Sequence, residues 1–149
     1  GDKKNKILRK IDHAMIGFLV AGTYTPLCII SLRSVGGISL MCYVWVLALM
    51  ALVIKLFWIN CPKWVSSVIY LLMGWACAPS LGNIYNTLPS GGFRLLLLGG
   101  ITYTIGALIY AMKIPFLERN RHFKSHEIFH LFIMGGTLFH YAMIYLYIA

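Results

Sequence analysis

Long apolar stretches separated by short polar segments dominate this sequence. Five stretches approach the roughly 20 residues that a helix needs to cross about 30 Å of hydrocarbon. The segments between them carry glycine, proline and asparagine, which favour turns. The pattern predicts an all-α, polytopic transmembrane helix bundle that forms one domain over residues 1–149, with a basic cytoplasmic segment at 1–10. The predicted helices span residues 11–32, 38–59, 65–81, 93–112 and 126–149.

Two prolines mark interruptions within these predicted helices. Pro26 lies inside the first stretch, where it frees the carbonyl of Gly22 and kinks the helix. The hydroxyls of Thr23 and Thr25 can satisfy the loosened backbone. The stretch 65–81 is the shortest of the five and contains Pro79 near its end, so its boundaries are the least sharply defined.

Composition separates this chain from soluble domains. Sixty per cent of its residues are hydrophobic and 11% are charged, whereas soluble domains carry about 25% charged residues. A soluble protein of this size could not cover its surface with so few polar side chains. The net charge of +9 does not indicate a nucleic-acid partner, because the charges lie between apolar runs rather than on one soluble face. Membrane lipids are the expected partners.

The distribution of basic residues predicts the orientation of the bundle. Cytoplasmic segments of membrane proteins collect lysine and arginine. With five crossings, eleven basic residues fall on the side of the N-terminus and only Arg33 and Arg94 on the other. We therefore expect a cytoplasmic N-terminus and an outside C-terminus, in a multi-pass protein of the bacterial plasma membrane. The eleven are Lys3, Lys4, Lys6, Arg9, Lys10, Lys55, Lys63, Lys113, Arg119, Arg121 and Lys124.

Ionisable residues inside membrane helices are costly and indicate functional sites. Asp12 lies at the inner end of the first predicted helix, and His126, Glu127 and His130 lie at the inner end of the last. The predicted topology thus places an acid and two histidines at one membrane depth. His126 and His130 are spaced as in HExxH, where residues one helical turn apart can bind one metal ion.

Structural explanations stand beside these functional ones. The two histidines can be solvated at a helix start, and Asp12 can be stabilised by the dipole of a first helical turn. His13 points about 100° away from Asp12 and suits a position at the membrane interface. His140 lies ten residues beyond His130, about 15 Å deeper. It cannot reach the same ion and is expected to bond a neighbouring helix.

Three motifs together resemble hemolysin III-type proteins of the progestin and adipoQ receptor superfamily. Ile11-Asp-His13 followed by Ala21-Gly-Thr-Tyr-Thr-Pro26 is similar to the third helix of that family. Tyr103-Thr-Ile-Gly106 with Tyr110-Ala-Met-Lys-Ile-Pro115 is similar to the end of the sixth. Ser125-His-Glu-Ile-Phe-His130 is similar to the start of the seventh. The likeness extends over essentially the whole chain.

The resemblance implies a seven-helix protein with an inside N-terminus, of which this chain shows the third to seventh helices. It also implies that His126 and His130 bind zinc and that Asp12 contacts the metal through a water or hydroxide. The family's third histidine ligand, with a nearby serine, lies on the second helix, which we expect before residue 1. Glu127 varies in the family and points about 100° from His126, so we favour Asp12 as the water-orienting acid.

Three functions follow from this combination of residues and resemblance. The first is a zinc-dependent membrane hydrolase that cleaves a lipid amide or ester, because zinc activates water and polarises carbonyls. The second is a pore-forming cytolytic protein, the role for which the family was named. No predicted helix shows the continuous polar stripe that a water-filled pore needs. The third is a receptor-like bundle in which zinc only holds helices together.

Overall fold

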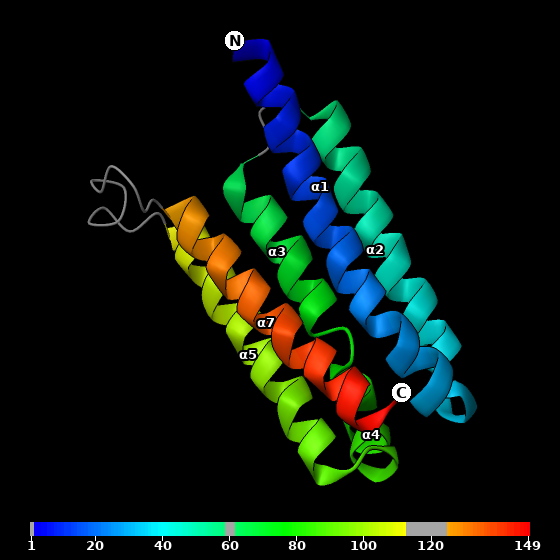
Figure 1. Cartoon of the computed structure of the whole chain (residues 1–149). Coiled ribbons are helices and arrows are strands. Elements are labelled where there is room, and N and C mark those ends of the chain that lie inside the picture. The colour runs from blue at the N-terminus through cyan, green and yellow to red at the C-terminus, as the bar shows by residue number, and fades with distance from the viewer. Residues whose placement is uncertain (1, 59–61, 113–124) are drawn as a thin grey trace.

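The computed structural model describes residues 2–58, 62–112 and 125–149, and shows a bundle of helices that run side by side along one axis (Figure 1). No strand occurs in these residues, which confirms the all-α polytopic fold. Four helical segments have the length and composition of membrane spans: 37–54, 67–87, 90–112 and 127–147. A shorter apolar helix covers Met15–Ser31. The main helices are α1 (Asp2–Pro26), α2 (Gly37–Phe57), α3 (Lys63–Gly74), α5 (Ser90–Met112) and α7 (Ser125–Tyr147).

The first helix is longer than predicted and changes its winding at Pro26. Because lysine, leucine and arginine are good helix formers, α1 already begins at Asp2. After Pro26 the chain continues as a π-helix, Leu27–Ser31, that ends with a bond from the Leu32 amide to the Leu27 carbonyl. The hydroxyls of Thr23 and Thr25 do bond backbone carbonyls, but those of Val20 and Ala21 rather than that of Gly22.

The third span differs most from the prediction, because it is interrupted in the middle. Helix α3 ends at Gly74, a 3-10 turn covers Ala78–Ser80, and a further helix, α4, continues through Leu81–Thr87. Pro79 has no amide proton with which to bond the Trp75 carbonyl, and the Ala78 amide bonds that carbonyl instead, at 2.9 Å. The span therefore extends through residues that were expected to form a loop.

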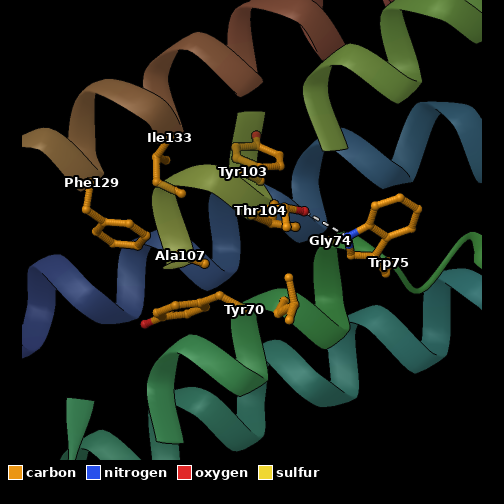
Figure 2. Close-up of a pocket in the computed structure, with 10 residues that line it drawn as sticks. Tyr70, Gly74, Trp75, Tyr103, Thr104, Ala107, Phe129 and Ile133 are labelled. Atoms are coloured by element: carbon orange, nitrogen blue, oxygen red, sulfur yellow. Dashed lines mark hydrogen bonds between the residues drawn. The ribbon is translucent and has the colours of Figure 1, made fainter. Parts of the chain in front are cut away.

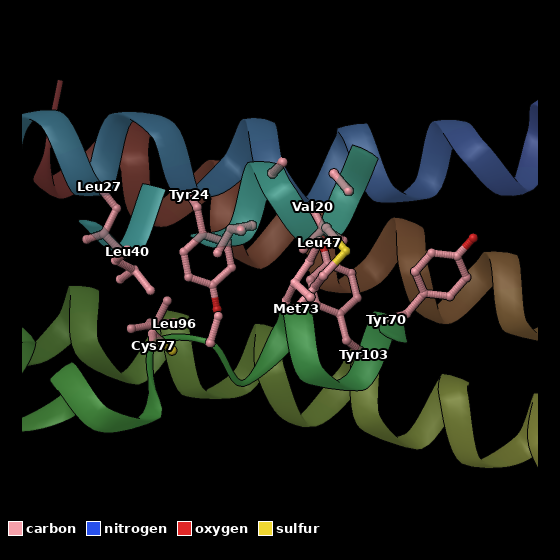
Figure 3. Packing of buried hydrophobic residues seen from close by; sticks show 14 of the residues in the cluster. Val20, Tyr24, Leu27, Leu40, Leu47, Tyr70, Met73, Cys77, Leu96 and Tyr103 are labelled. Carbon is pink, nitrogen blue, oxygen red and sulfur yellow. The ribbon is translucent and has the colours of Figure 1, made fainter. Parts of the chain in front are cut away.

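A tyrosine from α1 stabilises this interruption. Tyr24 is 2% exposed, and its hydroxyl donates to the Gly74 carbonyl at 2.6 Å, where α3 ends. Figure 3 shows the Tyr24 ring extending from α1 across the buried cluster towards the interrupted span. This contact satisfies a carbonyl at a helix end inside the apolar core, where an unpaired polar group is costly.

Replacing Tyr24 with phenylalanine should therefore lower the free energy of unfolding by about 1–2 kcal/mol, because the Gly74 carbonyl loses its donor. Thermal unfolding of the purified protein in detergent measures the change. Tyr85→Phe is the matched control, because Tyr85 is 64% exposed on α4. Equal effects of the two substitutions would show that the Tyr24 bond contributes nothing.

The bundle has two ends with different chemistry (Figure 1). The Asp12 end comprises the starts of α1, α3 and α7 and the ends of α2 and α5. The Arg33 end comprises α4, the starts of α2 and α5, the end of α7 and a 3-10 turn at Arg33–Val35. There the chain reverses at Gly36, whose φ of 94° lies in the left-handed region that favours glycine.

Candidate functional site

The structure brings Asp12 and His130 into direct contact at the Asp12 end. Asp12 projects from α1 and His130 from α7, and His130 Nε2 lies 3.1 Å from Asp12 Oδ2. A carboxylate can only accept, so the imidazole donates its Nε2 proton in this contact. The side chains of His130 and Asp12 are 30% and 43% exposed, respectively. Two residues 118 positions apart in the sequence thus form one polar pair at the edge of the bundle.

The other predicted ligand lies one turn earlier on the same helix. Helix α7 runs without interruption from Ser125 to Tyr147, so His126 and His130 share one helical face. The side chain of His126 lies outside the described part of the chain, as does that of His13. Among the described side chains, no three His, Cys, Asp or Glu residues come together. The predicted zinc site therefore stays a prediction.

Ser125, the residue before His126, has a buried polar atom that the sequence did not single out. Its side chain is fully buried, and its hydroxyl has no hydrogen-bond partner among the described residues. Leaving a buried hydroxyl unsatisfied costs about 1–3 kcal/mol. A small polar ligand beside the start of α7 would relieve that cost. Of the described side chains at this end, the His130 imidazole and the Asp12 carboxylate are of the donor types that bind zinc in proteins.

Three stacked aromatic rings fix the position of α7 at this end. Phe129 is fully buried and stacks on Tyr110 of α5 at 4.9 Å and on Tyr70 of α3 at 6.4 Å between ring centroids. The Phe129 ring also meets the ring of His130 edge-on at 5.7 Å. The stack joins three helices directly beside the polar pair. Rigid support of this kind holds a polar site in one geometry.

The interior beside the aromatic stack is nearly filled. Figure 2 shows the cavity there, into which Tyr70, Tyr103, Phe129 and Ile133 point. Its volume of about 10 Å³ equals the space for a single water molecule. No acyl chain fits into it.

His140 is separate from this pair and buried deep in the bundle. It is 2% exposed, and its Nδ1 lies 3.4 Å from the hydroxyl of Thr23 on α1. The rings of Tyr24 and Tyr103 meet its imidazole edge-on at 6.5 and 5.2 Å. This confirms the expected bond to a neighbouring helix. His140 therefore belongs to the packing between α1, α5 and α7 rather than to the candidate metal site.

These features define the class of the protein as a multi-pass α-helical membrane protein with a polar pair at one end. The sequence matches the family model described as "Haemolysin-III related" over residues 1–141. Since this match covers nearly the whole chain, the protein belongs to the haemolysin-III related family. No solved structure matches the chain significantly.

Similar proteins occur in bacteria and mammals. "Hemolysin-3" of Bacillus cereus is 35% identical over 147 residues, which cover 98% of this chain and 64% of the relative. "Hemolysin-3 homolog" of Bacillus subtilis (strain 168) is 41% identical over 137 residues, which cover 91% and 61%. "Monocyte to macrophage differentiation factor" of Homo sapiens is 26% identical over an alignment of 156 residues, which covers 97% of this chain and 60% of the relative. The chain thus spans about three fifths of the length of these curated relatives.

Proposed function

We propose that Asp12, His126 and His130 form part of a zinc site in a membrane-embedded lipid hydrolase. The observation that carries this proposal is the contact of 3.1 Å between His130 Nε2 and Asp12 Oδ2, made between α1 and α7. The imidazole of His130 and the carboxylate of Asp12 meet there at the edge of a membrane bundle. Ionisable groups in such a position mark functional sites more often than structural ones. A further histidine would complete three protein ligands, the usual number in catalytic zinc sites.

Each of these residues has a distinct task in the proposal. His126 and His130 would hold the metal, and His130 would release its Nε2 proton to do so, because a ligating nitrogen needs a free lone pair. Asp12 already lies within hydrogen-bond distance of His130 and would orient a water molecule and accept its proton. Bound zinc would supply the Lewis acidity that polarises a carbonyl oxygen and acidifies that water. Glu127 is exposed on another helical face and has no role in this scheme.

A lipid amide or ester is the proposed substrate class. The site lies at the end of apolar helices, and the cavity beside Phe129 is too small for an acyl chain. A substrate therefore reaches the site laterally from the bilayer, on the exposed side of Asp12 and His130. Such a lipid presents its carbonyl at the membrane interface while its chains remain in hydrocarbon.

We further propose that the Asp12 end faces the cytoplasm of a bacterial plasma membrane. The basic residues of α1 that precede Asp12 belong to this end, as do Lys55 near the end of α2 and Lys63 at the start of α3, whereas Arg33 and Arg94 belong to the other. The excess of lysine and arginine indicates the cytoplasmic side. The proposed site then lies at the inner leaflet, with the C-terminus outside.

Pore formation is the second candidate, favoured by the name hemolysin that the two bacterial relatives carry. One experiment distinguishes the candidates. The full chain is reconstituted in vesicles that contain N-acyl and O-acyl lipids and an entrapped dye. Release of fatty acid and release of dye are then measured together, with and without a zinc chelator.

The hydrolase proposal expects fatty-acid release that the chelator stops, that zinc restores and that His130→Ala abolishes. Glu127→Gln should leave the release unchanged. Hydrolysis retained in His130→Ala would contradict the proposal. Dye release that chelation does not affect, without hydrolysis, would favour the pore. Zinc that only raises the melting temperature, without turnover, would favour a metal-stabilised bundle.

A further inference from the structure

The Arg33 end, at the opposite end of the bundle from Asp12 and His130, also has an open surface feature. An open groove of about 640 Å³ runs between the first turns of α2 and the interrupted span. Binding sites for small ligands have volumes of about 300–1,000 Å³, so the groove has room for a ligand rather than for isolated water. Ser39, Leu40 and Tyr43 line one wall, and Leu72, Trp75 and Pro79 line the other.

The groove exists because α3 stops early. Helix α2 is continuous, whereas the neighbouring α3 ends at Gly74. The chain after Gly74 does not continue the α-helix and forms a 3-10 helix at Ala78–Ser80. The small side chains of Ala76 and Ser80 leave the space between them unfilled. Trp75 forms a fixed inner wall, because its indole N–H donates to Thr104 of α5 at 2.8 Å (Figure 2). The groove is thus formed by the interruption of the backbone, and the hydrogen bond from Trp75 to Thr104 holds its inner wall.

The surroundings of the groove select an amphiphile with a negative head. Both walls belong to candidate membrane spans, so the bilayer supplies whatever enters. Arg33 is exposed two residues before Val35, which lines the groove. From His13 to Leu117 the sequence contains no acidic residue that could neutralise this arginine. A guanidinium at a membrane interface binds phosphate oxygens well.

We propose that this groove binds one acyl chain of an anionic phospholipid whose headgroup phosphate contacts Arg33. The apolar walls hold the chain, and the hydroxyls of Ser39 and Ser80 line the same groove. This site is independent of the proposed hydrolase. It lies at the opposite end of the bundle and shares no residue with the Asp12–His130 pair.

Photo-crosslinking of the full chain in vesicles tests the proposal. The probe is phosphatidylglycerol with a diazirine on one acyl chain, diluted into phosphatidylcholine. Labelled peptides are mapped by mass spectrometry. Label should concentrate on residues 35–43 and 71–80, and unlabelled phosphatidylglycerol should compete for it about tenfold better than phosphatidylcholine does.

Ser39→Trp fills the groove from an exposed position and should reduce the label on these segments at least fivefold. Arg33→Gln should remove the preference for phosphatidylglycerol. The matched controls are Val53→Trp on the exposed face near the other end of α2 and Arg94→Gln on α5, which should change neither result. Label spread evenly over the exposed helix faces, and insensitive to Ser39→Trp and Arg33→Gln, would overturn the proposal in favour of non-specific annular lipid.

Discussion

Replacing His130 with alanine should weaken zinc binding by more than about 100-fold, if the proposed site is correct. Changes around metal ligands alone cost about 10–100-fold in affinity, and loss of a ligand costs more. Asp12→Asn should have a smaller effect, about 10–100-fold, because in this proposal Asp12 orients the water on the metal rather than binding zinc directly. Zinc content of the purified protein and competition with a chelator of known affinity measure both effects.

Glu127→Gln is the matched control, since it changes a carboxylate on the same helical turn that does not share the His130 face. It should retain the zinc content of the unmodified chain. Circular dichroism should show equal helicity for all variants, because His130 and Asp12 are partly exposed and their loss leaves no buried charge. Equal zinc content in His130→Ala and the unmodified chain would show that the metal binds elsewhere.

The apolar pattern predicts most of the helices closely, because membrane crossing imposes a minimum length on each. The predicted helix 38–59 corresponds to α2 (Gly37–Phe57), and 126–149 corresponds to α7 (Ser125–Tyr147). The helix at 81–87 was missed because glycine and asparagine there favour turns. The buried pair Ile84 and Leu88, one turn apart, is the periodic signal that indicates a helix there.

The candidate site was only partly predictable. The number of predicted membrane crossings puts the start of the first helix and the start of the last helix on the same side of the membrane. The topology therefore places Asp12 and His130 at one depth. Their contact also depends on how α1 and α7 are rotated about their axes, and tertiary packing sets that rotation. The stack of Tyr70, Tyr110 and Phe129 contributes to it. The burial of the Ser125 hydroxyl, which has no hydrogen-bond partner among the described residues, is visible only in the structure.

Helices α5 and α7 approach each other closely at Gly99 and Gly136. A Cβ on Gly99 would overlap the ring of His140 and lie 3.2 Å from the Gly136 carbonyl oxygen. The ring cannot move aside easily, because Thr23, Tyr24 and Tyr103 enclose it. Close backbone approach through small residues is a main source of helix association in membranes.

Gly99→Val should therefore push α5 and α7 apart and lower the free energy of unfolding by about 3 kcal/mol or more, the upper range for overpacked cores. Gly100→Val is the matched control, because a Cβ there meets nothing within 4 Å and the change in helix propensity is the same. Thermal unfolding in detergent should show a large loss for Gly99→Val and little change for Gly100→Val. Similar curves for the two variants would mean that the α5–α7 approach is not as close as the structure shows.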